Sequence, residues 1–325
     1  MEGVLQVRDL HVHYVGRSSK NRVPAIRGVD FEIAHGQAVG ILGESGCGKS
    51  TLALAVVALL PLGGLVTKGS VRFRGRELVG LPDGELRSIR GAEIELIHQD
   101  PALVLHPVLR VDRQVSDVLR AHRPWDRSRC EREAHDILRR VGLAGTRVFR
   151  AYPHQLSGGQ RQRVVIGQAV ACTPKLVIAD EPTSSLDSTT QAEILELLGQ
   201  MRKELNVALL LISHDPGVLA ELCDYVFVMY AGRIVEEGRL VDVYSMPLHP
   251  YTRALLQSRV RPAGVGRQLG GLPCIPGGPP DPTRLPPGCS FEPRCSERMA
   301  VCAVREPTQT GPEATRRVRC FKYGC

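Results

Sequence analysis

Hydrophobic and polar residues alternate near the start of the chain, and uninterrupted apolar runs appear further along it. The alternation over residues 5–14 predicts a strand with one buried face, and residues 29–33 and 69–73 predict two more strands. Three segments are apolar at every position, namely residues 38–42, 176–179 and 207–212. Such runs are typical of strands buried on both faces of a parallel sheet, so we expect an α/β core.

Helical periodicity fills the spaces between these strands. A helix is predicted around residues 52–57, directly after a glycine-rich turn, and another over residues 131–141. Ile194, Leu197, Leu198 and Met201 would share one face of a further helix. The arginine-rich segment from about residue 101 to 155 has few strand signals, which indicates a helical insertion in the α/β core, and we expect a helical subdomain over about residues 101–170.

The glycine-rich turn carries the first recognisable chemistry. Residues 43–50 read Gly-Glu-Ser-Gly-Cys-Gly-Lys-Ser and match the phosphate-binding pattern G-x-x-x-x-G-K-[ST] between a strand and a helix. Backbone N–H groups of such a loop and the positive end of the helix hold phosphate oxygens. We expect Lys49 to reach the β- and γ-phosphates of ATP, and the Ser50 hydroxyl to bind Mg²⁺.

Two acidic residues end the apolar run 176–179. Asp180 stands at the exposed end of a buried strand, where it would organise Mg²⁺, and Glu181 could orient the water that attacks the γ-phosphate. The pair would mean little alone, but it follows a phosphate loop in the same chain.

The segment Leu156-Ser-Gly-Gly-Gln160 resembles the LSGGQ signature of ABC ATPases, and it directly follows the helical insertion, as in that family. The resemblance implies that Ser157, Gly158, Gly159 and Gln160 bind the γ-phosphate of an ATP held by a partner cassette. It also implies the ABC cassette fold, which has a RecA-like core, an N-terminal antiparallel β subdomain and an α-helical subdomain.

Other family positions match individually. Gln99 resembles the Q-loop glutamine, which touches Mg²⁺ and water, Asp187 resembles the D-loop aspartate, and His214 resembles the switch histidine. Tyr14 is placed like the aromatic residue that stacks on adenine, although an aromatic residue at a strand end is commonly part of the core. The residues expected to bind ATP are Tyr14, Gly43, Ser45, Gly46, Cys47, Gly48, Lys49, Ser50, Thr51 and Gln99. Those expected to act in catalysis are Lys49, Glu181 and His214, and those expected to bind Mg²⁺ are Ser50, Gln99 and Asp180.

The sequence after the cassette resembles the tail of the oligopeptide and dipeptide importer ATPases, which include nickel importers. The resemblance rests on residues 249–256, His-Pro-Tyr-Thr-Arg-Ala-Leu-Leu. It divides the chain into an ABC ATPase domain (1–255), a Pro/Gly-rich linker (256–288) and a Cys-rich extension (289–325). Cys289, Cys295, Cys302 and Cys320 would ligate a [4Fe–4S] cluster, as in similar proteins. Zn²⁺, or no metal at all, remain alternatives, and Cys274 and Cys325 are left without a role.

The family implies a motor role in an importer of di- or oligopeptides, or of nickel or another small solute. Its partners would be a second, non-identical ABC ATPase subunit, two transmembrane permeases and, indirectly, an extracytoplasmic substrate-binding protein. No stretch is long and apolar enough to span a bilayer, and there is no secretory signal, so we expect a peripheral protein on the cytoplasmic face of the cell membrane.

Net charge and two departures from the family pattern bear on the partners and the cargo. The net charge is +8, and residues 255–325 hold eleven Lys or Arg against five Asp or Glu. No nucleic-acid-reading motif accompanies them, so no nucleic acid is expected, although a soluble ABC ATPase acting on DNA or ribosomes is the rival class. His98 and the segment 105–107 differ from these importers near the surface that receives the permease, which leaves the cargo open.

Overall fold

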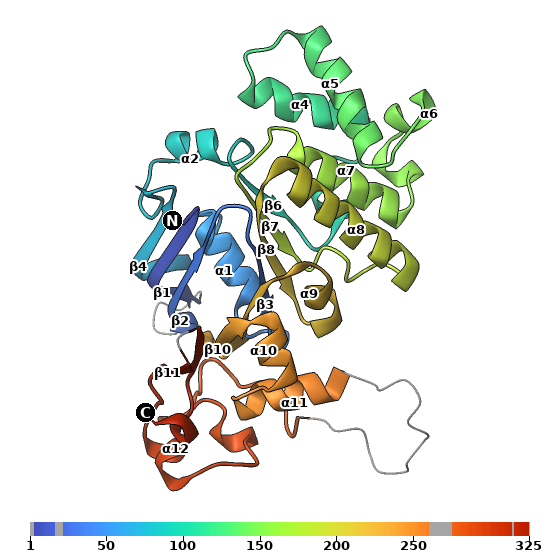
Figure 1. The fold of residues 1–325 in the computed structure, drawn as a ribbon. Helices are drawn as coiled ribbons and strands as arrows, with labels where there is room; N and C mark the ends of the chain where they lie inside the picture. The colour runs from blue at the N-terminus through green and yellow to red at the C-terminus, as the bar shows by residue number, and fades with distance from the viewer. Residues whose placement is uncertain (1–2, 17–21, 260–274, 314, 325) are drawn as a thin grey trace, which may run out of the picture. The chain divides into compact units, whose positions relative to one another are not determined.

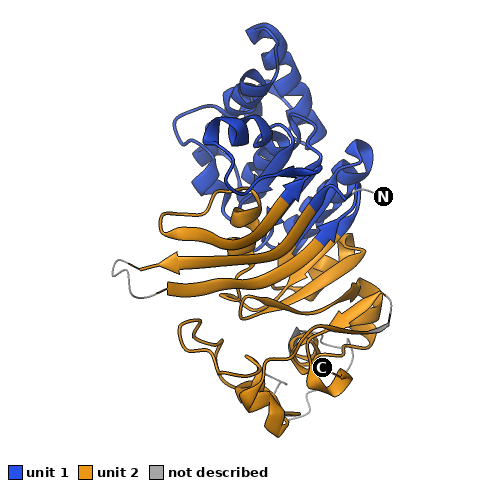
Figure 2. Cartoon of the chain, turned by 90° about the vertical axis from the view of Figure 1, so that its left-hand side faces the viewer, with its two compact units in different colours: residues 1–5, 32–38, 72–211 blue, residues 6–31, 39–71, 212–325 orange. Residues whose placement is uncertain are grey.

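The chain forms two compact units that each gather segments from distant parts of the sequence. The computed structural model describes residues 3–16, 22–259, 275–313 and 315–324. Unit 1 contains residues 1–5, 32–38 and 72–211, and unit 2 contains residues 6–31, 39–71 and 212–325 (Figure 2). Cys274, Cys325 and the part of the expected linker from 260 to 274 lie outside the described residues.

Unit 1 contains three neighbouring strands of a sheet and most of the helices in the middle of the chain (Figure 1). Its strands are β5 (Arg76–Glu77), β6 (Ile94–Ile97), β7 (Leu176–Asp180) and most of β8 (Ala208–Ser213). Its helices are α2 (Asp83–Ile89), α3 (Pro101–Val104), α4 (Val111–His122), α5 (Arg127–Arg140), α6 (Thr146–Phe149), η1 (Pro153–Gln155), α7 (Gly158–Val170) and α8 (Ser188–Leu205).

The two buried strands predicted in unit 1, residues 176–179 and 207–212, are confirmed as β7 and β8, whereas β6 was not predicted. β6 and β7 run parallel, with Ile97 opposite Ala179, and β8 lies on the other side of β7. Every residue of β7 and β8 is buried, and this includes Asp180, although we expected the end of its strand to be exposed. The expected helical insertion is present as α3 to α7, and α7 contacts β6 as well as the pair formed by α4 and α5.

Unit 2 contains both ends of the chain and the phosphate loop. Its strands are β1 (Leu5–Val15), β2 (Arg22–Ile33), β3 (Ala38–Leu42), β4 (Gly64–Phe73), β9 (Tyr225–Tyr230), β10 (Arg233–Arg239), β11 (Thr310–Glu313) and β12 (Arg316–Val318), with the outermost residues of some in unit 1. Its helices are α1 (Lys49–Val56), α9 (Pro216–Leu222), α10 (Leu240–Ser245), α11 (Pro250–Arg259), η2 (Glu292–Arg294), α12 (Ala300–Val304) and η3 (Phe321–Tyr323).

The sheet of unit 2 joins the phosphate-loop strand to the end of the chain. Its strands follow one another in the order β11-β12-β10-β9-β3, and β2, β1 and β4 are neighbours in a second sheet. β3 pairs with β9 in parallel, whereas β10 pairs antiparallel with both β9 and β12. The C-terminal residues therefore extend the same sheet that presents the phosphate loop.

None of the helices among the described residues combines the length and the apolar character needed to span a bilayer.

Candidate functional site

The phosphate loop follows β3 and leads directly into α1. Gly48 caps α1 with a φ of 109°, a left-handed conformation that glycine adopts at little cost. A Cβ there would lie 2.6 Å from the Ala25 carbonyl oxygen, so a side chain has neither the space nor the backbone conformation it needs. The loop is thus shaped by glycine at the point where its N–H groups start the helix.

Lys49 is buried and folds back over its own loop. Its Nζ donates to the carbonyl oxygens of Gly43 and Glu44, at 2.9 and 3.0 Å. Cys47 is also buried, and burial raises the pKa of its thiol to about 11. The cysteine therefore stays a neutral filler at ordinary pH.

Tyr14 lies near the beginning of α1. The hydroxyls of Tyr14 and Thr51 are 3.3 Å apart, so the structure brings together two residues that the sequence assigns to ATP. Tyr14 is half-buried rather than part of the core. His214, which follows β8, belongs to the same unit.

Gln99, Asp180 and Glu181 lie in unit 1. Gln99 comes shortly after β6, and the two acids come at the end of β7, so all three leave the carboxyl edge of two paired parallel strands. This edge is where α/β sheets bind ligands. Glu181 has a φ of 48°, a conformation that is strained for a residue other than glycine and is typical of functional sites.

The signature segment begins α7 with a reciprocal cap. The Gln160 N–H donates to Ser157 Oγ at 3.2 Å, and the Ser157 N–H donates to Gln160 Oε1 at 3.0 Å. This capping box leaves Gly158 and Gly159 in the first turn of the helix, where backbone N–H groups and the helix dipole favour anions.

The D-loop residue lies beside the signature. Asp187 caps α8 by accepting the Thr190 N–H at 3.0 Å and its hydroxyl at 2.8 Å. These bonds lower the pKa of Asp187. A Cβ on Gly159 would lie 2.5 Å from Thr190 Cγ2, so the starts of α7 and α8 are in close contact.

The four cysteines of the C-terminal region come from separate turns of unit 2. The Cys289 N–H donates to the Cys302 carbonyl at 2.8 Å, while Cys295 and Cys320 flank η2 and η3. Burial, and then the proximity of the other three, raises the pKa of the Cys289 thiol to about 11. Within the residues that the structure describes, no three His, Cys, Asp or Glu side chains form a group that could hold a metal ion.

The helical region of unit 1 presents apolar side chains to solvent. Leu103 is 85% exposed and Val108 is 69% exposed. Gln114 supports the loop between them, because its amide bonds the backbone of His106 and Leu109. A cleft of about 530 Å³ lies beside them, lined by Val108, Leu109, Arg110, Asp112, Arg113, Arg127, Glu131, His135, Arg150 and Tyr152.

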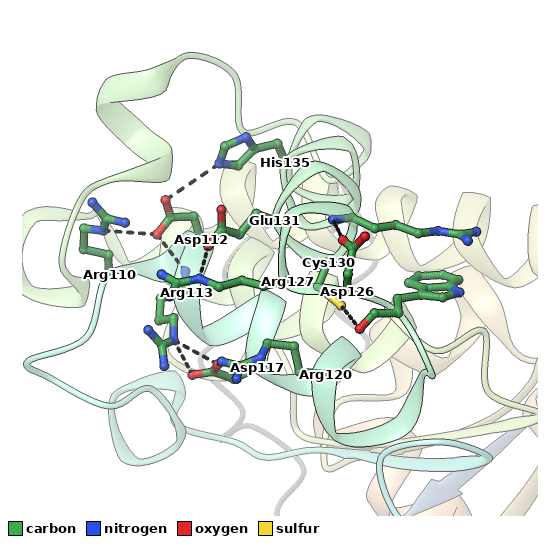
Figure 3. A network of polar contacts seen from close by, with 12 residues as sticks. Arg110, Asp112, Arg113, Asp117, Arg120, Asp126, Arg127, Cys130, Glu131 and His135 are labelled. Carbon is green, nitrogen blue, oxygen red and sulfur yellow. Dashed lines mark hydrogen bonds and ion pairs between the residues drawn. The ribbon is translucent and has the colours of Figure 1, made fainter.

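Ion pairs within α4 and within α5 involve several of the residues that line this cleft (Figure 3). Arg127 bonds Glu131 at 2.8 Å along α5, and Arg113 bonds Asp117 at 2.9 Å along α4. His135 lies 3.7 Å from Asp112 and connects the two helices.

Two residues far along the chain hold Glu44 in the phosphate loop, and no sequence pattern indicated them. Arg294 donates to both carboxylate oxygens of Glu44, and Tyr251 Oη accepts the Glu44 N–H. Glu44 occupies a variable position of the phosphate-binding pattern, and its partners are more than 200 positions away. No local signal in the sequence connects them.

Two families match the chain, one after the other. Residues 26–184 match the ABC transporter family, and residues 235–302 match the family of the oligopeptide/dipeptide transporter C-terminal region. The oligopeptide transport ATP-binding protein AppD of Bacillus subtilis is 40% identical, with 99% of this chain and 98% of the relative covered. The dipeptide transport ATP-binding protein DppD of the same organism is 43% identical, with 99% and 95% covered.

Solved structures agree with the fold. The chain resembles the ATP-binding cassette MJ0796, solved as a dimer in a post-hydrolysis state bound to ADP and Pi, with a TM-score of 0.65 and 28% identity. That match covers 73% of this chain and 98% of the cassette. The chain also resembles cbiO1 from Clostridium perfringens, a part of the cbiONQ ABC transporter complex, with a TM-score of 0.64 and 29% identity over 76% of this chain and 92% of the other.

Proposed function

Because the chain belongs to the ATP-binding subunits of oligopeptide and dipeptide ABC transporters, we propose that it drives uptake of di- or oligopeptides by hydrolysing ATP. The observation that carries this proposal is the succession of an ABC region and a peptide-transporter C-terminal region in one chain. Nearly full-length similarity to peptide transport subunits supports the cargo class. Nickel or another small solute is the alternative cargo.

The phosphate loop would bind the ATP phosphates. Lys49 already lies buried against the loop carbonyls, from which its ammonium can turn toward a γ-phosphate. Ser50 follows at the exposed start of α1, where its hydroxyl can bind Mg²⁺. Tyr14, held near Thr51, would contact the adenine ring.

The residues that follow β6 and β7 would promote hydrolysis. Asp180 and Gln99 would supply oxygen ligands to Mg²⁺, and Glu181 would orient the attacking water and take its proton. His214 would contact the γ-phosphate. Water then adds to the γ-phosphorus as the bond to the β-phosphate oxygen breaks, giving ADP and phosphate.

A second cassette would complete each ATP site. Residues 157–160 at the start of α7 offer backbone N–H groups to the γ-phosphate bound by the partner, and Asp187 would relay contacts across the dimer. The related cassette MJ0796 was solved as a dimer. We propose that the partner is a different subunit of the same family.

The exposed apolar residues of the helical region would receive the permeases. Leu103, Val104 and Val108 lie in or just after α3, and exposed apolar side chains gathered in this way are typical of interaction sites. Docking of two transmembrane permeases would hold the chain at the cytoplasmic face of the membrane. The substrate-binding protein would act through the permeases on the other face.

We also propose that Cys289, Cys295, Cys302 and Cys320 hold a [4Fe–4S] cluster, with Zn²⁺ as the alternative. Thiolates suit both metals. The support is that the four cysteines lie within one C-terminal segment, where Cys289 and Cys302 share a backbone hydrogen bond and Cys295 and Cys320 adjoin η2 and η3. A bound cluster would crosslink these turns.

Metal content tests the cluster directly. Iron, sulfide and zinc would be measured on anaerobically purified protein, beside Cys295→Ser and the buried control Cys130→Ser. We expect about four irons per chain, lost only in Cys295→Ser. One zinc per chain and no iron would show that the cysteines hold Zn²⁺ instead of a [4Fe–4S] cluster. Absence of both metals would refute this part of the proposal.

The transport function is tested with the protein reconstituted with its permeases and partner cassette. Glu181→Gln should retain ATP binding and lose hydrolysis and peptide uptake, while the exposed control Glu204→Gln behaves like the wild type. Unchanged ATP turnover in Glu181→Gln would show that the ATP site of this chain does not hydrolyse ATP and that the partner's site does. ATP hydrolysis stimulated only by nucleic acid would overturn the transport role.

A further inference from the structure

The side chain of Glu44 in the phosphate loop is held by the C-terminal region of the same chain. Arg294 Nη1 donates to Glu44 Oε2 at 2.7 Å, and Arg294 Nη2 donates to Oε1 at 3.0 Å. A guanidinium that bonds both oxygens of a carboxylate fixes its orientation as well as its distance. The two residues are 250 positions apart in the sequence.

Arg294 is itself held firmly. Its side chain is 8% exposed, its Nε donates to the Pro276 carbonyl at 2.9 Å, and its guanidinium lies over the Tyr230 ring at 5.8 Å. Phe291, one turn earlier, packs edge-on against Tyr230 with ring centroids 5.2 Å apart. A guanidinium restrained on several sides loses little further freedom when it binds Glu44.

The backbone of Glu44 is restrained as well. Its N–H donates to Tyr251 Oη at 2.9 Å, and its carbonyl accepts Lys49 Nζ at 3.0 Å. Glu44 therefore connects the C-terminal region on one side with the phosphate-binding lysine on the other.

We propose that Arg294 is a positioning residue for ATP binding. It has two effects on the loop. It fixes Glu44, and with it the carbonyl that holds Lys49, and it neutralises a carboxylate that would otherwise repel the ATP phosphates. The C-terminal region thereby tunes the nucleotide affinity of its own cassette. This inference rests on the proposed role of residues 43–50 in binding ATP.

The test is the ATP dependence of hydrolysis in the full assembly. We expect Arg294→Ala to raise the KM for ATP about tenfold, the size of one charge-assisted contact, with a smaller change in kcat. Arg294→Lys keeps the charge but loses the bidentate contact, so its KM for ATP should lie between those of the wild type and Arg294→Ala. The control is Arg298→Ala. The Arg298 side chain is 63% exposed, and its Nη1 lies 3.8 Å from Glu292 Oε1, so this change removes an arginine of the same region without touching Glu44.

A second variant separates positioning from general damage to the fold. Adding Glu44→Gln to Arg294→Ala removes the unpaired carboxylate, so the KM should fall by the part that charge repulsion causes, while the part caused by the lost positioning of residue 44 remains. A KM that stays normal in Arg294→Ala, or a double variant no better than the single one, would overturn the inference. Lys49→Ala tests its basis, since ATP binding that survives this change would refute the loop's role instead.

Discussion

Glu236 and Arg316 form an ion pair that is almost completely withdrawn from solvent. Arg316 Nη2 donates to Glu236 Oε1 at 2.8 Å, and the two side chains are 3% and 0% exposed. The same carboxylate accepts the N–H groups of Leu248 and His249, at 2.9 and 2.8 Å. One buried charge thus joins β10 and β12 to the segment that starts α11.

Breaking this ion pair should destabilise unit 2 strongly. Arg316→Met leaves the buried Glu236 carboxylate without its partner, and breaking a buried ion pair in this way typically costs about 3–5 kcal/mol. Urea unfolding should show this loss, and Glu236→Gln combined with Arg316→Met should recover part of it. The exposed neighbour Arg305→Met is the control. Equal stability of the single and double variants would contradict the role of the charge.

His249 should make stability sensitive to mild acid. It is fully buried, its Nδ1 accepts the Tyr251 N–H at 3.0 Å, and burial lowers its pKa to about 4. A lowered pKa means that the stabilisation is complete above the unfolded value of 6.5 and is lost as the pH falls toward 4.

The comparison is between the wild type and His249→Gln, by urea unfolding from pH 7.5 to 4.5. The difference in unfolding free energy between the wild type and His249→Gln should shrink by about 2–3 kcal/mol as the pH falls from 7.5 to 4.5. A gap independent of pH would show that His249 does not titrate as the burial indicates.

Glu95 should have the opposite signature, with stability falling as the pH rises. It lies in β6, and burial raises its pKa to about 8. The folded state therefore keeps a proton that the unfolded state releases above about pH 4.5, so stability falls as the pH rises and levels off above about 8. Glu95→Gln should remove this loss, with a gain in melting temperature that is larger at pH 8.5 than at pH 6. The exposed Glu193→Gln provides the baseline, and equal gains at both pH values would contradict the prediction.

The cap at the signature helix should tolerate an acid and not an apolar residue. Gln160→Glu can still accept the Ser157 N–H, as glutamate does at this position of a capping box. Gln160→Ala cannot, and we expect it to cost about 1 kcal/mol at the start of α7. Thermal unfolding of both variants distinguishes them, and identical curves would argue that the cap contributes nothing.

Local patterns predicted much of this fold. The run at residues 38–42 is β3 without any change of bounds, and the helix after the glycine turn begins at Lys49. The four residues assigned to one helical face, from Ile194 to Met201, are all buried in α8. Periodicity and the phosphate-loop pattern work here because their information lies within a few residues.

The contacts that reach across the chain could not be predicted in this way. β12 is the short segment Arg-Arg-Val, which has no strand pattern of its own and exists because β10 offers it an edge. Arg294 and Glu44 lack any shared local signal, since each looks like an ordinary surface charge in its own segment. The backbone contact between Cys289 and Cys302 similarly depends on the geometry of two turns, and amino-acid composition does not determine that geometry.

The pairing of β3 with β9 has a consequence for the order in which the chain becomes functional. Val39 is opposite Tyr225, so most of unit 1 is synthesised between two strands that must meet. A nascent chain that has already made residues 43–50 therefore lacks the neighbour that supports them, and Arg294 emerges later still. The ribosome must therefore synthesise the chain as far as β9 before β3 can pair with it, so the strand that leads into the phosphate loop gains its neighbour late in synthesis.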